Sequence, residues 1–221
     1  MKASAETQTK RSRDPGSTRA ALVEAATRLF ANSGFDGTTT DLIATAAGVN
    51  KALISYHFGG KAGLYRSILR DTFREINARL ESLDDPRLPA PERLDRLVSS
   101  FADLYRARPW FPSMILREVL SGGHHLDDAA LPEFLSIFGH VRRMVADGIR
   151  DGSFRAVDPL MTHLTVVGSL VFFFVTIPLR ERLLGEGRVP AAAPSVEQYV
   201  RHVRELMHRG LAPDPTETRG G

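Results

Sequence analysis

The sequence predicts an all-α protein, with an N-terminal three-helix domain built around a helix-turn-helix and a larger helical domain behind it. Apolar residues recur at helical spacing along most of the 221 residues, and no stretch alternates convincingly as a strand does. Glycines and prolines separate the periodic stretches from one another. Between residues 38 and 61, two short helical patterns meet at Gly48, which is the layout of a helix-turn-helix DNA reader.

The composition is typical of a soluble globular protein, with 43% hydrophobic and 25% charged residues. The length allows one or two domains with a sizeable core. Cysteine does not occur, which excludes a disulfide framework, thiolate metal sites and a cysteine nucleophile, and which suits a reducing compartment. The first fifteen residues contain no apolar signal-peptide core, so the expected localisation is cytoplasmic.

The basic excess lies at the N-terminal end of the chain. Residues 1–65 hold 8 Lys and Arg against 5 Asp and Glu, whereas residues 66–221 hold 21 against 21. All four lysines also lie before residue 66. A local positive field favours a phosphate backbone as partner, although an excess of three also arises by chance.

Four segments are expected along the chain. They are a disordered basic arm over 1–15, a DNA-binding domain over 16–76, a helical effector-binding and dimerisation domain over 77–211, and a disordered tail over 212–221. The arm either enters a minor groove beside the reader or is a solvated tail. A first helix is expected to be capped by Ser17 or Asp14 and to stop at Gly34, with Phe35 folding back on its last turn. A fourth helix is expected from about 61 to 83. Further helices are expected over 91–107, 110–121, 130–151, 157–180 and 194–210.

The helix-turn-helix is expected at about 39–58. Thr38 and Thr39 stand where an N-cap is needed, Gly48 allows the positive φ of a tight turn, and Asn50 is placed to cap the second helix. The inner face of the first helix is expected to comprise Leu42, Ile43, Ala46 and Ala47. In the second helix, Ile54 and Phe58 are expected to point inward. The exposed or partly exposed faces then carry Lys51, Ala52, Leu53, Ser55 and Tyr56.

These spacings resemble the tetracycline-repressor (TetR) family of bacterial regulators over residues 16–76. The resemblance rests on Thr38-Thr39, Ile43-Ala44, Ala47-Gly48-Val49, Asn50, Tyr56-His57-Phe58, Gly59-Gly60, Lys61 and Leu64, and on the preceding Leu29 to Phe35. It implies that Thr39 and Thr40 touch phosphate, and that Lys51, Ala52 and Ser55 face base edges. Leu53 would meet a thymine methyl, and the phosphate backbone would be held by Tyr56, His57 and Lys61.

Two positions depart from the family pattern. Many members carry an aromatic residue where this chain has Ser55, and a smaller residue where it has Leu53. An operator inferred from relatives is therefore in doubt. The alternative role for the aromatic end of the second helix, Tyr56-His57-Phe58, is a plug for the three-helix core. For Phe58 that role is the favoured one.

A dimer surface is expected because one three-helix head reads only a few base pairs. We predict a homodimer formed through residues about 157–180 and 194–210. Residues 164–179 are apolar all round, as in a helix buried between core and partner. At 16 residues, ended by Pro178, they are short for a membrane span of about 20, so membrane insertion is the weaker alternative.

The resemblance also implies a small-molecule effector among the middle helices. The candidate lining residues are Arg106, Trp110, Phe111, Met114, Arg117, Phe134, Phe138 and His163. Residues of these types are more often part of an ordinary core or surface. Glu118 is expected to pair with an arginine. His124-His125 with Asp127-Asp128 resembles a metal cluster, but its irregular spacing favours a solvated loop. No metal and no cofactor are predicted.

The predicted function is a sequence-specific DNA-binding transcriptional regulator, a repressor that an effector releases from a palindromic double-stranded operator. An activator or dual regulator on the same scaffold is the alternative. A helical enzyme or ligand-binding protein is a third reading, although the sequence contains no Ser-His-Asp order, phosphate loop or dinucleotide fingerprint. The chain is therefore not expected to be an enzyme.

Overall fold

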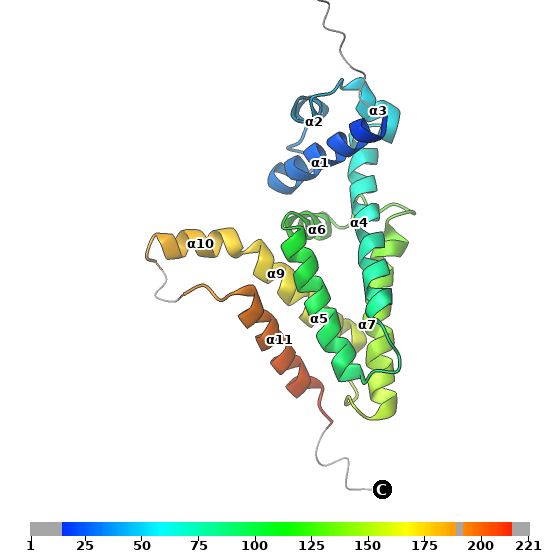
Figure 1. Ribbon diagram of the computed structural model, residues 1–221, viewed down its shortest axis with the longest axis vertical. Coiled ribbons are helices and arrows are strands. Elements are labelled where there is room, and N and C mark those ends of the chain that lie inside the picture. The colour runs from blue at the N-terminus through cyan, green and yellow to red at the C-terminus, as the bar shows by residue number, and fades with distance from the viewer. Residues whose placement is uncertain (1–14, 189–191, 214–221) are drawn as a thin grey trace, which may run out of the picture. The chain divides into compact units, whose positions relative to one another are not determined.

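A computed structural model describes residues 15–188 and 192–213, and Figure 1 shows them as helices joined by turns. Except at their inner ends, the expected arm over 1–15 and tail over 212–221 lie outside the described residues. The elements are α1 (Pro15–Ser33), α2 (Thr40–Ala47), α3 (Ala52–Phe58), α4 (Lys61–Leu83), α5 (Ala90–Ala107), α6 (Phe111–Leu120), α7 (Leu131–Asp151), α8 (Pro159–His163), the π-helical turn η1 (Leu164–Gly168), α9 (Ser169–Val175), α10 (Ile177–Gly185) and α11 (Val196–Leu211). Because the described ranges contain no strand, the all-α prediction is confirmed.

The chain divides into two compact units, Met1–Tyr65 and Arg66–Gly221. The division falls inside α4, whereas the sequence prediction placed the boundary after residue 76. The two differ because α4 continues through the division without a break, so no turn or composition change marks it. Tyr65 still belongs to the first unit, where its ring meets Phe30 and Phe35 edge-on at centroid distances of 4.9 and 5.3 Å.

The core of the first unit is built on the apolar face of α1. Leu22, Ala25, Ala26 and Phe30 are buried along it, as the helical spacing predicts. Gly34 then ends the helix at φ 73°, and the ring of Phe35 folds back onto that of Phe30 at 6.0 Å. The predicted stop and the predicted return of Phe35 are both confirmed.

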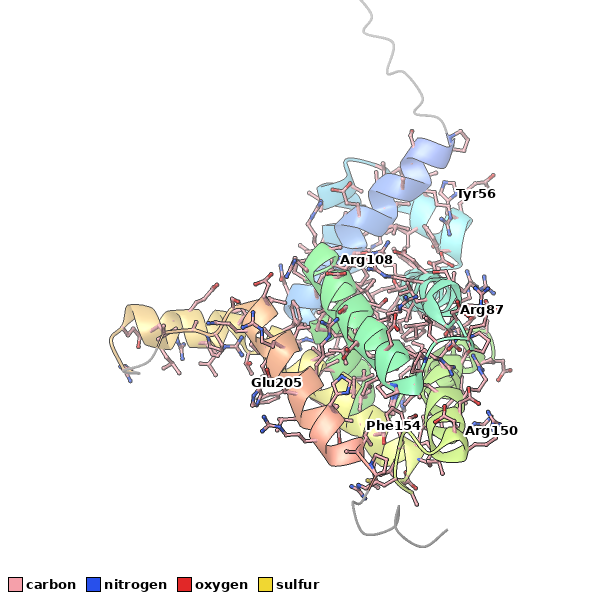
Figure 2. All side chains as sticks on the ribbon, turned by 60° about the horizontal axis from the view of Figure 1, so that its bottom comes forward. Tyr56, Arg87, Arg108, Arg150, Phe154 and Glu205 are labelled. Atoms are coloured by element: carbon pink, nitrogen blue, oxygen red, sulfur yellow. The ribbon has the colours of Figure 1, made fainter. Side chains whose placement is uncertain are left out.

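The second unit is organised around α5, which packs on α7, α9 and α11. Its buried face includes Leu94, Val98, Phe101 and Tyr105. After α7, the ring of Phe154 approaches the backbone so closely that a Cβ on Gly148 would lie 2.3 Å from it. Phe154 is buried, and Figure 2 shows its place at one end of this unit.

The helix expected over 157–180 is broken, which corrects the sequence prediction. It consists of α8, the π-turn η1 and α9, and after Thr176 the axis bends by 44° into α10. Pro178 was expected to end the helix, yet it lies in the first turn of α10. A proline is well accommodated there because the first turn of a helix needs no N–H donors.

The apolar segment 164–179 is only partly buried. Val166, Leu170, Phe173 and Phe174 are inside the unit, whereas 55% of Leu164 and 67% of Phe172 remain exposed. Among the described helices, none is by itself long and apolar enough to cross a membrane, although the bent pair Pro159–Val175 and Ile177–Gly185 has the length and composition when taken together.

Candidate functional site

The turn between α1 and α2 uses the two predicted threonines differently. The Thr39 hydroxyl accepts a hydrogen bond from the Leu42 N–H at 3.2 Å and so caps α2. The buried Thr38 hydroxyl instead donates to the carbonyl of Gly34 at 2.8 Å. One threonine therefore begins α2, and the other holds α2 to the end of α1. Thr40, the first residue of α2, is half-buried.

The inner face of α2 is narrower than predicted. Ile43, Ala44 and Ala47 are buried, but Leu42 is 50% exposed and Ala46 is exposed as well. The prediction for these last two was wrong because an eight-residue helix packs on α1 through a single stripe, and the neighbours of that stripe turn away. Leu42 therefore lies on the outer surface of the motif, where sequence reasoning did not place it.

The second helix of the motif, α3, is anchored by one apolar residue. Ile54 is fully buried, Gly48 takes the predicted left-handed φ of 64°, and the Asn50 side chain accepts the Ala52 N–H at 2.8 Å. Phe58 is half-buried beneath the guanidinium of Arg19, 5.1 Å from its ring centroid. These contacts fix which face of α3 is free.

That free face carries the residues predicted to read DNA. Lys51, Ala52 and Ser55 are exposed, and Leu53 and His57 are half-exposed. Tyr56 is 80% exposed, and Figure 2 shows its side chain at the surface of the unit. Small, cationic and hydroxyl side chains on one accessible helix face suit the edges and backbone of a DNA groove.

Lys51 is paired to the other helix of the motif. Its Nζ lies 2.8 Å from Oδ2 of Asp41, which belongs to the first turn of α2. Both side chains remain open to solvent, with exposed fractions of 54% and 71%. This pair was not predicted, because the two residues are ten positions apart and only the turn brings them together.

Lys61 begins α4 and is bound within the protein. Its ammonium donates to the carbonyls of Phe35 and Thr38, both at 2.9 Å. It also lies 4.0 Å from the centroid of the Phe35 ring, a favourable cation–π distance. An ammonium has three donors, so these two hydrogen bonds leave one N–H for a phosphate.

Among the candidate effector residues, Trp110, Phe134 and Phe138 are half-buried in the second unit. Phe111 and Met114 are buried. The Phe111 ring meets Trp110 at 5.7 Å and Phe73 at 6.0 Å, and Phe73 in turn meets Phe134 at 5.5 Å. Phe73 was missed by the sequence reading, although its helical register with Leu69 and Ile76 signals a buried face.

The two candidate arginines lie apart from that cluster. Arg106 is exposed and pairs with Glu197 at the start of α11, and Arg117 is exposed on α6. The ring contacts therefore link Phe111 to Trp110 and, through Phe73, to Phe134, whereas Arg106 and Arg117 are exposed.

His163 meets Phe138 edge-on, with ring centroids 5.6 Å apart. Its Nδ1 is buried without a hydrogen-bond partner among the described residues, and burial lowers the pKa of the imidazole. An unmade hydrogen bond of this kind costs about 1–3 kcal/mol. Asn77 Oδ1, also buried and unpartnered within the described ranges, is a second such group that the sequence did not indicate.

Glu118 pairs with a histidine rather than with the expected arginine. Its buried carboxylate accepts the His125 backbone N–H at 2.6 Å and lies 3.0 Å from Nδ1 of the same residue. In the neighbouring turn, Asp127 accepts the Ala130 N–H at 3.0 Å. Over the described part of the chain, no group of three or more His, Asp or Glu side chains is placed to hold a metal ion.

A small cavity lies elsewhere in the second unit. Its lining is Leu80, Leu83, Asp84, Arg93, Leu97, His140 and Met144, and its volume is about 20 Å³, enough for roughly one water molecule. Arg93 is almost fully buried there and donates to Asp84 at 2.8 Å and Asp147 at 2.7 Å. None of the predicted effector residues lines this cavity.

Comparisons with known proteins agree with this arrangement. Residues 22–68 match the model described as bacterial regulatory proteins, tetR family, and residues 91–210 match a tetracyclin repressor-like C-terminal domain. The chain belongs to the TetR family. It is a DNA-binding regulator of transcription and not an enzyme, as the sequence predicts.

Relatives with assigned names support the same family. The HTH-type transcriptional repressor NicS of Pseudomonas putida is 31% identical over 164 residues, which cover 71% of this chain and 75% of NicS. The HTH-type transcriptional regulator RutR of Escherichia coli K12 is 25% identical over 204 residues, which cover 92% of this chain and 95% of RutR.

Solved structures share the fold at lower identity. A tetR-family regulatory protein from Rhodococcus RHA1 superposes with a TM-score of 0.73 at 18% identity, covering 89% of this chain and 98% of that one. FadR from Bacillus subtilis, solved in complex with stearoyl-CoA, gives 0.70 at 16% identity, covering 87% and 98%.

Proposed function

We propose that this TetR-family protein is a homodimeric repressor that binds a palindromic operator and leaves it when a small molecule enters the second unit. The observation that carries the proposal is the free face of α3. It is held outward by the buried Ile54 and presents Lys51, Ala52 and Ser55 together. A seven-residue helix with such a face suits insertion into a major groove.

Each residue of that surface has a proposed role. Lys51, Ala52 and Ser55 face base edges, and Leu53 meets a thymine methyl. The backbone phosphates are held by Thr39, Thr40, Tyr56, His57 and Lys61. The exposure of Tyr56 favours a phosphate contact over a role in the core, whereas the bonds of Lys61 to two carbonyls make it both a structural tie and a fixed positive charge beside the DNA.

The homodimer is proposed to form through the apolar surface of α8 to α10 and α11. Within the second unit, Met161 is 61% exposed, Phe172 67% and Leu206 54%. Leu164 and Leu179 lie along the same segments and are also exposed. Contiguous exposed apolar residues mark protein interaction sites, and two-fold pairing would place two heads about 34–36 Å apart on DNA.

The effector is proposed to bind among the aromatic residues of α6, α7 and α8. Phe111, Phe134 and Phe138 supply apolar walls, and His163 Nδ1, which has no hydrogen-bond partner within the described ranges, supplies a hydrogen-bonding group. Apolar walls with a few polar atoms are typical of ligand sites. FadR of Bacillus subtilis holds stearoyl-CoA, which supports a ligand-binding role for this fold.

Repression is favoured over activation because NicS, which covers most of this chain, is named a repressor. Such a regulator acts on the chromosome, so we place it in the bacterial cytoplasm. An activator on the same scaffold differs only in where its operator lies within the promoter.

Selection of bound duplexes from a random DNA pool by the purified full chain tests this function. The expected result is an enriched two-fold-symmetric motif whose binding weakens steeply with salt. Equal binding to every duplex, or binding indifferent to salt, would overturn the proposal. The promoters that contain the motif would then be assayed with and without the chain to determine the sign of regulation.

A further inference from the structure

The ion pair between Asp41 and Lys51 places a negative charge on the surface proposed to meet DNA. Lys51 precedes α3, and its Nζ lies 2.8 Å from the carboxylate of Asp41 in the first turn of α2. Asp41 is also next to Thr40, a proposed phosphate contact. An acidic residue here is unexpected, because it repels the phosphate backbone that its neighbours are proposed to hold.

The Asp41 carboxylate lies in the first turn of α2 and beside the Lys51 ammonium, two groups that also attract a phosphate. The N-terminus of α2 favours negative charge, and Lys51 offers an ammonium to any phosphate oxygen within reach. The carboxylate satisfies both groups while the protein is free. Random DNA must therefore displace Asp41 before Lys51 contributes to binding.

The pair is weak enough to be exchanged. Both side chains are more than half exposed, and exposed ion pairs contribute little to stability because water and salt screen them. A base edge with two acceptors, such as that of guanine, binds lysine in a geometry that a lone phosphate does not offer. The correct operator therefore competes with Asp41 better than random sequence does.

We infer that Asp41 is a specificity-determining residue, which restrains Lys51 and suppresses binding to non-operator DNA. The inference rests on the proposed reading surface of α3. Asp41 would thus discriminate by opposing non-operator DNA, rather than by adding a contact to the operator. Asp41 lowers affinity for all DNA, but it lowers affinity for random DNA more.

The test compares Asp41→Asn with the wild-type chain on two duplexes of equal length, the motif recovered by selection and a randomised sequence. Fluorescence anisotropy over a salt series gives both affinities. We expect Asp41→Asn to tighten random-sequence binding by about threefold or more and operator binding by less. The salt slope on random DNA should steepen by about one, because Lys51 gains a phosphate.

Asp36→Asn is the matched charge control. Asp36 is an exposed carboxylate of the same unit, and within the described residues no ion pair joins it to Lys51. If Asp36→Asn reproduces the change, the effect is one of net charge and the inference fails. Circular dichroism melting of each variant verifies that the first unit stays folded.

A double-mutant cycle with Lys51→Ala completes the test. If Asp41 acts through Lys51, then Asp41→Asn should have no effect on specificity in the Lys51→Ala background. An undiminished effect there would overturn the inference, as would weaker operator binding by Asp41→Asn. Failure of the wild-type chain to prefer any motif would instead refute the proposed function, so the two failures are distinguishable.

Discussion

The ammonium of Lys61 donates a hydrogen bond to the carbonyl of Thr38 across 2.9 Å. This bond joins the start of α4 to the residue that precedes the cap of α2. Together with the bond to Phe35, it ties the helix-turn-helix to the helix that leads into the second unit. The residue proposed to hold a phosphate is therefore also a structural tie within the head.

Lys61→Ala is expected to weaken DNA binding to a similar degree on every sequence and to destabilise the head by about 1–3 kcal/mol, because two charge-assisted hydrogen bonds are lost. Lys61→Met keeps an apolar stem over Phe35 but removes the charge together with both hydrogen bonds. Thermal unfolding and a gel-shift salt series measure both effects. An unchanged salt slope for both variants would contradict the proposed phosphate contact. An unchanged melting temperature would contradict the structural role of Lys61.

Gly63→Ala is expected to disturb the junction of α3 and α4. A Cβ on Gly63 would lie 1.8 Å from the carbonyl oxygen of Phe58, and this backbone atom cannot move without shifting α3. We expect a loss of about 1–3 kcal/mol of unfolding free energy and of operator affinity. Gly139→Ala, whose Cβ would meet only a side chain at 3.7 Å, should be tolerated, and equal urea midpoints for the two variants would contradict this account.

Phe172→Asp tests the proposed dimer surface. The ring is 67% exposed, so the substitution should leave the protomer folded, but in a dimer it would bury an unpaired charge. The dimer dissociation constant should rise by at least about tenfold. Light scattering after size exclusion measures it, with Leu120→Asp as control because Leu120 is 77% exposed on α6, outside the proposed surface. Equal effects of the two substitutions would argue against this interface.

Stability should fall on mild acidification because of His140. Burial lowers the pKa of this histidine, as does the nearby charge of Arg143, whose Nη2 donates to the imidazole Nδ1 at 2.8 Å. The unfolded chain takes up the proton first, so stability is complete above the ordinary histidine pKa of about 6.5 and declines as the pH falls through it. Urea unfolding at several pH values between 5 and 7.5 measures the decline.

His140→Gln should flatten this dependence, and His163→Gln should do so in part, because burial lowers the pKa of His163 as well. The hydrogen bond to Arg93 holds down the pKa of Asp147. Carboxylates of this kind stop stabilising the folded protein only at lower pH. The pH range in which the histidines titrate is therefore separable from that of the carboxylates. An identical pH profile for the wild type and His140→Gln would contradict the assignment.

Helix positions were predictable where one clear apolar stripe ended at a breaker. The fourth helix was expected over about 61–83 and spans Lys61–Leu83, because its stripe is long and its flanks contain glycine or proline. The prediction that Leu42 is buried was wrong because, in a helix as short as α2, two different faces are equally apolar in the sequence. The prediction that Pro178 ends a helix was wrong because proline occurs both just after the end of one helix and in the first turn of the next, and the sequence does not distinguish the two cases.

The reading surface was predictable as a set of residues but not as a set of contacts. Helical spacing predicted that Ile54 is buried and that Lys51, Ala52, Ser55 and Tyr56 are exposed. The bonds of Lys61 and the pairing of Lys51 with Asp41 depend on how the turns fold, and no periodicity encodes them. For the same reason, periodicity did not indicate that Asn77 Oδ1 and His163 Nδ1 lack hydrogen-bond partners among the residues that the structure describes.

The central claim is that one α3 face reads each half of a two-fold-symmetric operator. DNA selection repeated with Leu53→Ala, Ser55→Ala and Tyr56→Phe tests it most directly. The account predicts that the first two variants change base preference at the same position in both half-sites. Tyr56→Phe should keep the wild-type motif and bind it more weakly. A motif without two-fold symmetry, or one that Leu53→Ala and Ser55→Ala leave unchanged, would contradict the account.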